Sequence, residues 1–122
     1  MKNFECQISI ESQDSNDSYM VTVHDDLEKG ILFYKEENKT ITTYDYKNDI
    51  FTRENDEMRI QYQFRLNEVT EKKVLVKNIN SEININIFTK KLEKKSDYIE
   101  IIYEIENNEF IYKIKKEMEV WV

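Results

Sequence analysis

Apolar and polar residues alternate through most of this chain, which has one Gly and no Pro among its 122 residues. A period of two places successive side chains on opposite faces of an extended strand, and the Ile, Val, Tyr, Phe and Thr residues that carry it favour strands. Such strands must bury their apolar faces and protect their hydrogen-bonding edges. The pattern therefore predicts an all-β fold, either one closed barrel or one sandwich.

The clearest alternation lies in residues 58–66, where apolar residues alternate with Arg and Gln. Residues 98–105 also fit a helical spacing, but their isoleucines and the turn expected at Asn107-Asn108 favour a strand. A short helical turn is expected only within residues 90–97. The other expected strands are residues 4–10, 19–24, 31–34, 40–46, 50–53, 74–76, 83–87 and 110–114.

The chain is long enough for one hydrophobic core, and no linker rich in Gly, Ser or Pro divides it. Residues 1–122 are therefore expected to form one domain. The first residues contain no apolar run long enough for a signal peptide or a membrane span, so we expect a cytoplasmic location. Cys6, the one cysteine, shares the apolar face of Phe4, Ile8 and Ile10, which favours core packing over a reactive or metal-bound thiol.

Charge and residue usage argue against several classes of function. A net charge of −7 is unfavourable for binding nucleic acid. One glycine cannot build a phosphate-binding loop, and His24, the one histidine, excludes a multi-histidine metal site. Eight of the 25 Asp and Glu residues fall in expected turns, where burial would not separate their pKa values for acid–base catalysis; these are Asp14, Asp17, Asp25, Asp26, Asp49, Glu54, Asp56 and Glu57. We therefore expect no enzyme activity, no metal or other cofactor, and neither nucleic acid nor a membrane as partner.

Three blocks of sequence resemble a known family. They are Met58-Arg-Ile-Gln-Tyr-Gln-Phe64, Glu82-Ile-Asn-Ile-Asn-Ile-Phe-Thr89 and Tyr98-Ile-Glu-Ile-Ile-Tyr-Glu-Ile105. In strand pattern and spacing they are similar to the YwiB-like family of small bacterial proteins. The resemblance implies a lipocalin-like (calycin) barrel, so we expect a single antiparallel up-and-down barrel of about eight to ten strands. It implies no catalytic or binding residue.

Aromatic residues on inward faces are the best candidates for a binding site. Tyr62, Phe64, Tyr103 and Tyr112, with Phe110 beside them, occupy inward positions of expected strands. A tyrosine hydroxyl in an apolar interior needs a hydrogen-bond partner, and a small barrel either fills its lumen with side chains or holds one ligand. We therefore expect a binding module that takes a small apolar or amphipathic ligand into the barrel lumen.

A filled core without a ligand is the alternative. The chain would then be a structural or protein-interaction barrel, with residues 117–122 as an exposed tail. Trp121 would separate these roles, because it either packs across the barrel floor or projects as an interface anchor.

An up-and-down strand order determines how the charged loops are distributed, because alternate loops share one end of the barrel. Residues 14–18, 36–38, 54–57 and 107–108 would then form an acidic end. The opposite end would hold residues 25–28, 47–49, 72–73 and 90–95, a lysine-rich rim that could attract an anionic head group.

Overall fold

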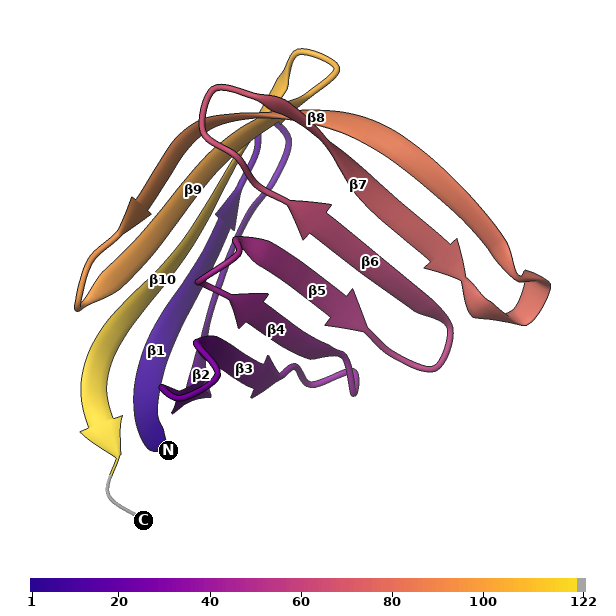
Figure 1. Cartoon of the computed structure of the whole chain (residues 1–122). Helices are drawn as coiled ribbons and strands as arrows, with labels where there is room; N and C mark the ends of the chain where they lie inside the picture. The colour runs from indigo at the N-terminus through magenta and orange to yellow at the C-terminus, as the bar shows by residue number, and fades with distance from the viewer. Residues whose placement is uncertain (121–122) are drawn as a thin grey trace.

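The computed structural model describes residues 1–120, which form ten antiparallel strands around one closed barrel (Figure 1). The strands are β1 (Lys2–Glu11), β2 (Asn16–Asp26), β3 (Ile31–Lys35), β4 (Ile41–Asp45), β5 (Ile50–Glu54), β6 (Met58–Gln63), β7 (Val69–Val76), β8 (Ser81–Lys94), β9 (Tyr98–Ile105) and β10 (Asn108–Val120). Each pairs with its neighbours in sequence, and β1 pairs with β10 to close the barrel. The predicted all-β up-and-down barrel is confirmed.

The core consists of the apolar side chains that point inward from the alternating strands. Ile8 on β1 and Ile101 on β9 are fully buried, as is Cys6. Phe4 and Ile10 pack against the same cluster, so the predicted apolar face of β1 is confirmed. The barrel therefore forms because strand alternation places one apolar row per strand inside.

Burial of Cys6 leads to a prediction about its chemistry. Burial raises the pKa of the Cys6 thiol to about 11, although nearby Lys116 lowers it in part. At about pH 8 the folded protein should therefore not react with a thiol reagent, since the thiolate is the nucleophile and the side chain is inaccessible. Adding urea should restore the reaction rate of an exposed cysteine. The absorbance of the released or coupled reagent measures the reaction. Rapid labelling of Cys6 without denaturant would contradict its burial.

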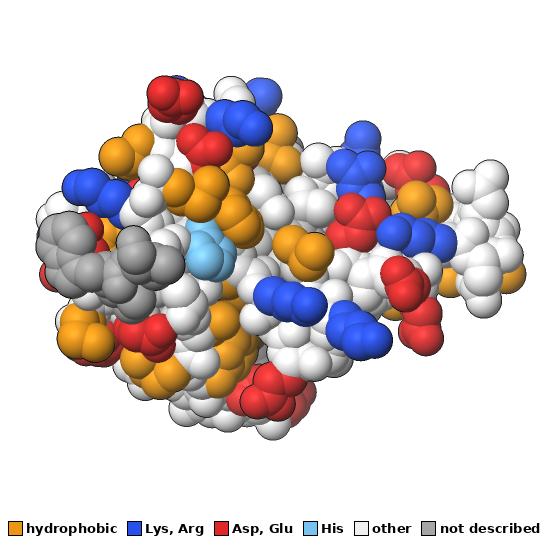
Figure 2. All heavy atoms as spheres, turned by 90° about the horizontal axis from the view of Figure 1, so that it is seen from below, with side chains coloured by type: hydrophobic (Ala, Val, Ile, Leu, Met, Phe, Trp, Pro, Cys, Tyr) orange, Lys and Arg blue, Asp and Glu red, His pale blue; other side chains and the backbone are white. Residues whose placement is uncertain are grey.

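β8 is long because it changes partners along its length. Its first half pairs with β7 up to Phe88, and its second half pairs with β9 from Phe88 onward. A register shift between Thr89 and Lys91 marks a bulge, and bulges bend a strand. The hairpin of β7 and β8 consequently projects beyond the barrel as an arm, on the right in Figure 1. In Figure 2 the same arm carries interspersed lysine and carboxylate side chains.

The helical turn predicted within residues 90–97 is wrong. β8 stays extended through Lys94, and the one helical element of residues 1–120 is the 3₁₀ turn Lys77–Ile79. Cross-strand ion pairs favour the extended form: Lys90 Nζ lies 2.6 Å from Glu104 of β9, and Lys91 Nζ lies 2.5 Å from Glu100 of β9. The strand predicted for residues 98–105 is confirmed as β9.

Other expected boundaries shift by a few residues. The last hairpin turn is Glu106-Asn107 rather than Asn107-Asn108, with φ values of 49° and 68°. Both turn residues thus have positive φ, as tight hairpin turns of this kind require. The strand from Met58 ends at Gln63 and leaves Leu66 49% exposed in a loop.

The expected tail is also different. Residues 117–120 belong to β10, and residues 118–120 pair with β1, so this segment is not a tail. Trp121 lies outside the described residues.

The ten strands place the loops after β1, β3, β5, β7 and β9 at one end of the barrel, here called the Asn38 end. The other loops lie at the opposite end, here called the Ser96 end. The acidic segments fall at or beside the Asn38 end, as predicted. The prediction of a lysine-rich rim is wrong, because residues 72–73 lie within β7 and residues 90–94 lie within β8. Several carboxylates expected in turns are in strands instead; these are Asp17, Asp25 and Asp26 of β2 and Glu54 of β5.

Candidate ligand site in the barrel lumen

The barrel wall is incomplete between β2 and β3. These strands share three residue pairs, from His24↔Phe33 to Asp26↔Ile31, although β2 has 11 residues. Residues 16–23 of β2 therefore pair with β1 alone. A cleft of about 520 Å³ occupies this opening at the Asn38 end, with Tyr19 and Val21 on one side and Lys35 on the other.

A second, smaller cavity of about 180 Å³ lies inside the barrel. Its walls include four tyrosines and three charged residues: Tyr34, Tyr62, Tyr103, Tyr112, Glu36, Arg53 and Lys72. Ile10, Glu36 and Arg53 line both this cavity and the cleft. The opening in the wall therefore leads to the lumen. We call these two spaces together the lumen site.

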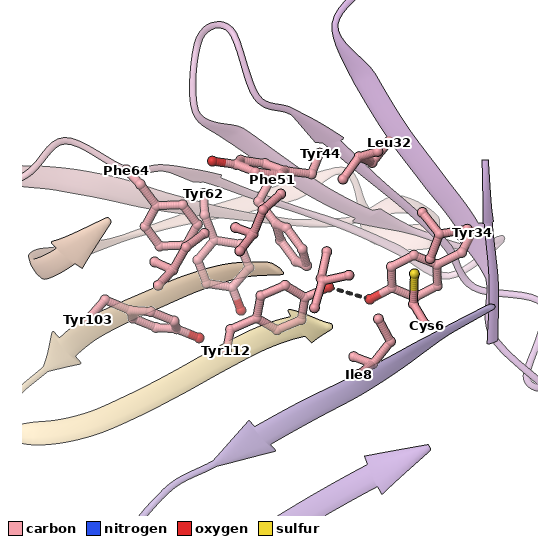
Figure 3. Close-up of a cluster of buried hydrophobic side chains, with 14 of the residues drawn as sticks. Cys6, Ile8, Leu32, Tyr34, Tyr44, Phe51, Tyr62, Phe64, Tyr103 and Tyr112 are labelled. Atoms are coloured by element: carbon pink, nitrogen blue, oxygen red, sulfur yellow. Dashed lines mark hydrogen bonds between the residues drawn. The ribbon is translucent and has the colours of Figure 1, made fainter. Parts of the chain in front are cut away.

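Three of the four residues predicted for ligand binding line the inner cavity. Tyr62, Tyr103 and Tyr112 come from β6, β9 and β10 and converge there (Figure 3). The fourth, Phe64, is 2% exposed and lies behind them, with its ring stacked on Tyr62 at a centroid distance of 5.6 Å. Phe64 thus supports the tyrosines and is not part of the cavity wall.

The tyrosine hydroxyls divide into two pairs. Tyr34 and Tyr112 are hydrogen-bonded, with 2.5 Å between their oxygens. The hydroxyls of Tyr62 and Tyr103 point toward each other in Figure 3, and the side chain of Tyr62 is a hydrogen-bond partner of Tyr103. Both residues line the inner cavity. Burial raises the pKa of Tyr103 and Tyr112 well above the usual tyrosine range, so both remain neutral hydrogen-bond donors.

A charged pair lies where the cleft meets the cavity. Arg53 Nη2 donates to Glu36 Oε2 at 2.8 Å. The hydroxyls of Tyr19 and Thr42 each donate to Glu36 Oε1 at 3.2 Å, so both carboxylate oxygens have donors. Burial disfavours the charge on Arg53, but the bond to Glu36 and its negative charge together raise the pKa of Arg53.

One donor of this pair has no acceptor. Arg53 Nε is buried and has no hydrogen-bond partner among residues 1–120. Buried donors are nearly always satisfied, so this one marks a place where a ligand oxygen or a water fits.

Sequence analysis missed Glu36, Arg53, Lys72 and Tyr34. A signal existed for Arg53, which follows buried Phe51 by two residues and so occupies an inward position of β5. Glu36 lies just after β3 and meets Arg53 through the pairing of β3, β4 and β5. That pairing is not visible in local sequence.

The Ser96 end holds a separate cleft of about 310 Å³ over the apolar side chains of Leu32, Ile99 and Ile114. Asp25, expected in a solvated turn, is 6% exposed here and accepts a hydrogen bond from the Tyr46 hydroxyl at 3.2 Å. Lys94 is paired with Asp49 at 2.9 Å. The charged groups of Asp25 and Lys94 are therefore already bound to other residues of the protein.

His24 lies away from both spaces. Its Nδ1 is 2.5 Å from Asn3 Oδ1, and its ring centroid is 4.9 Å from that of Phe33. In the described part of the chain, no three His, Cys, Asp or Glu side chains gather closely enough to hold a metal ion. The same residues contain no helix that is both long and apolar enough to cross a membrane.

The barrel fold has a counterpart among solved structures. The crystal structure of the YwiB protein from Bacillus subtilis matches 96% of this chain and 90% of its own, with a TM-score of 0.63 and 15% sequence identity. The two proteins share a fold. The resemblance to YwiB-like proteins predicted from sequence is thus confirmed by the structure. No protein-family model matches the chain, and no curated protein matches its sequence.

Proposed function

We propose that this barrel is a binding module, not an enzyme, and that it takes a small amphipathic ligand into the lumen site. The observation that carries the proposal is an inner cavity joined to an opening in the wall between β2 and β3. Binding sites of this kind combine apolar walls with a few polar groups that orient the ligand. The rings of Tyr62 and Tyr103 supply the apolar surface here, and their hydroxyls supply the polar groups.

The acidic group at the site supports binding over catalysis. Glu36 accepts hydrogen bonds from Arg53, Tyr19 and Thr42, which use both of its oxygens. These three donors, one of them a guanidinium, hold the carboxylate in a fixed orientation. Glu36 is better suited to hold Arg53 in place at the mouth of the inner cavity.

Replacing the two cavity hydroxyls tests this function. Tyr62→Phe and Tyr103→Phe should each weaken binding of a fluorescent apolar probe about two- to tenfold, because each loses a hydrogen bond worth roughly 0.5–1.5 kcal/mol. Stability in urea should change little, since both rings still pack. Tyr98→Phe is the matched control, because Tyr98 bonds to Glu93 and lines the cleft at the Ser96 end.

The outcomes separate the two functions under consideration. Stoichiometric probe binding that falls in Tyr62→Phe and Tyr103→Phe supports the lumen site. A fall in Tyr98→Phe alone would place the probe at the Ser96 end and contradict the proposal. If no probe binds, and native mass spectrometry of protein purified without denaturant shows no retained molecule, the structural or interaction barrel becomes the better account.

A further inference from the structure

We infer that the ligand of the lumen site is a carboxylic acid of about one ring in size, bound with its carboxylate toward Arg53 and Lys72. This inference rests on the proposed function and names the class of ligand. Three features of the site carry it: its balance of charge, the unpaired Nε donor of Arg53 beside two tyrosine hydroxyls, and its volume.

The inner cavity has one positive charge more than it has negative charges. Its charged residues are Arg53, Lys72 and Glu36. Arg53 and Glu36 offset each other at 2.8 Å. Lys72 forms no ion pair with the described carboxylates, and its Nζ lies 5.1 Å from the centroid of the Tyr62 ring. An anionic group would therefore balance the charge of the site.

Lys72 faces the lumen because of its register. It lies opposite Tyr62 in the pairing of β6 and β7, so both side chains are on the inner face. Lys73, the next residue, points to the outer face and is exposed. The two lysines lie on opposite faces of the same strand, so Lys73 provides a matched control for substitutions of Lys72.

The donors at the site suit a carboxylate. Arg53 Nε is buried without an acceptor in residues 1–120. The hydroxyls of Tyr62 and Tyr103 open to the same cavity. A carboxylate has two oxygens that accept several hydrogen bonds and would satisfy these donors, whereas an amide offers one acceptor oxygen and adds donors of its own.

Glu36 does not prevent an anion from binding here. Its oxygens accept from Arg53, Tyr19 and Thr42, so its charge faces donors from three elements. The side chain of Glu36 lies at the outer limit of the cavity, where the cleft begins. An acid seated further in, against Tyr62 and Lys72, has Arg53 at its outer side.

Volume limits the size of the acid. The inner cavity measures about 180 Å³, and an apolar cavity of about 150 Å³ accommodates benzene. One aromatic ring with a carboxylate thus fills the space, and a longer substituent would extend into the cleft. The aromatic walls, in which the Phe51 ring lies 5.6 Å from Tyr62 and 4.8 Å from Tyr112, favour a planar ring.

Benzoate and benzamide form a matched pair of probes, because they share ring and shape and differ in charge. We expect benzoate to bind the native protein roughly tenfold more tightly than benzamide in titration calorimetry. Lys72→Gln should reduce benzoate affinity to near that of benzamide, while Lys73→Gln should leave it unchanged. Raising the salt concentration should weaken benzoate binding only. Circular dichroism of both variants checks that the barrel remains folded.

Each result bears on a different claim. Equal binding of benzoate and benzamide, or equal losses in Lys72→Gln and Lys73→Gln, would overturn the carboxylate and leave the binding module intact. Binding of the fluorescent apolar probe with no binding of benzoate would do the same. If neither benzoate nor the apolar probe binds, both the inference and the proposed function fail.

Discussion

Raising the pH above about 10 is expected to unfold this barrel in one cooperative step. Burial raises the pKa of several tyrosines above 10.0, the ordinary value for this side chain; they are Tyr19, Tyr34, Tyr44, Tyr103 and Tyr112. These groups ionise in the unfolded chain before they ionise in the folded one. Their contribution to stability is therefore complete below pH 10 and is lost as the pH rises.

The size of this effect makes it testable. Each such tyrosine lowers the free energy of unfolding by about 1.4 kcal/mol for every pH unit between its unfolded and folded pKa values. The summed loss from several such tyrosines exceeds the free energy of unfolding of an ordinary small domain within one or two pH units above 10. Near-ultraviolet absorbance of tyrosinate and far-ultraviolet circular dichroism should change together. Ionisation of most tyrosines near pH 10 with unchanged circular dichroism would show that they are not buried.

Truncating one isoleucine of β8 should have a much larger effect than truncating another. Ile87 is 1% exposed in the core, whereas Ile83 is 55% exposed on the arm. Ile87→Ala should lower the free energy of unfolding by about 2–5 kcal/mol, because it removes buried methyl groups and leaves a cavity. Ile83→Ala should lower it by less than about 1 kcal/mol.

Urea denaturation of the two variants measures this difference directly. Both substitutions remove the same atoms from the same strand, so β propensity is matched and burial alone differs. Similar losses of stability in the two variants would mean that the arm packs as tightly as the core, which would contradict the exposure of Ile83.

Local alternation was sufficient to predict the strands and the inward aromatic residues. Tyr62, Tyr103 and Tyr112 lie inside because one row of each strand is apolar, and that pattern needs no knowledge of partners. Segments that depend on cross-strand partners were harder. Lys90 and Lys91 form ion pairs with Glu104 and Glu100 of β9, which favour the extended form of β8, and these partners are not visible in residues 90–97 alone.

Alternation with Phe51 indicated the inward position of Arg53, but the other charged residues of the site, Glu36 and Lys72, were not predictable, for a related reason. Glu36 and Arg53 are 17 residues apart and meet only through the register of three strands. Lys72 stands in a stretch of mixed residues, where its inward direction follows from its pairing with Tyr62. The inward positions of the tyrosines and of Arg53 therefore follow from local sequence, whereas the positions of Glu36 and Lys72 follow from the topology.

The pairing of β1 with β10 also determines when the barrel can form. This seam joins residues from the two ends of the chain, such as Ile8 and Ile114, and Cys6 lies within it. During synthesis β1 has only β2 beside it until the last strand has emerged, so its other edge stays open to strands of other molecules. Contacts of such long sequence separation also form slowly. Closure of this seam should therefore be the late event in folding, and crowding of nascent chains its main hazard.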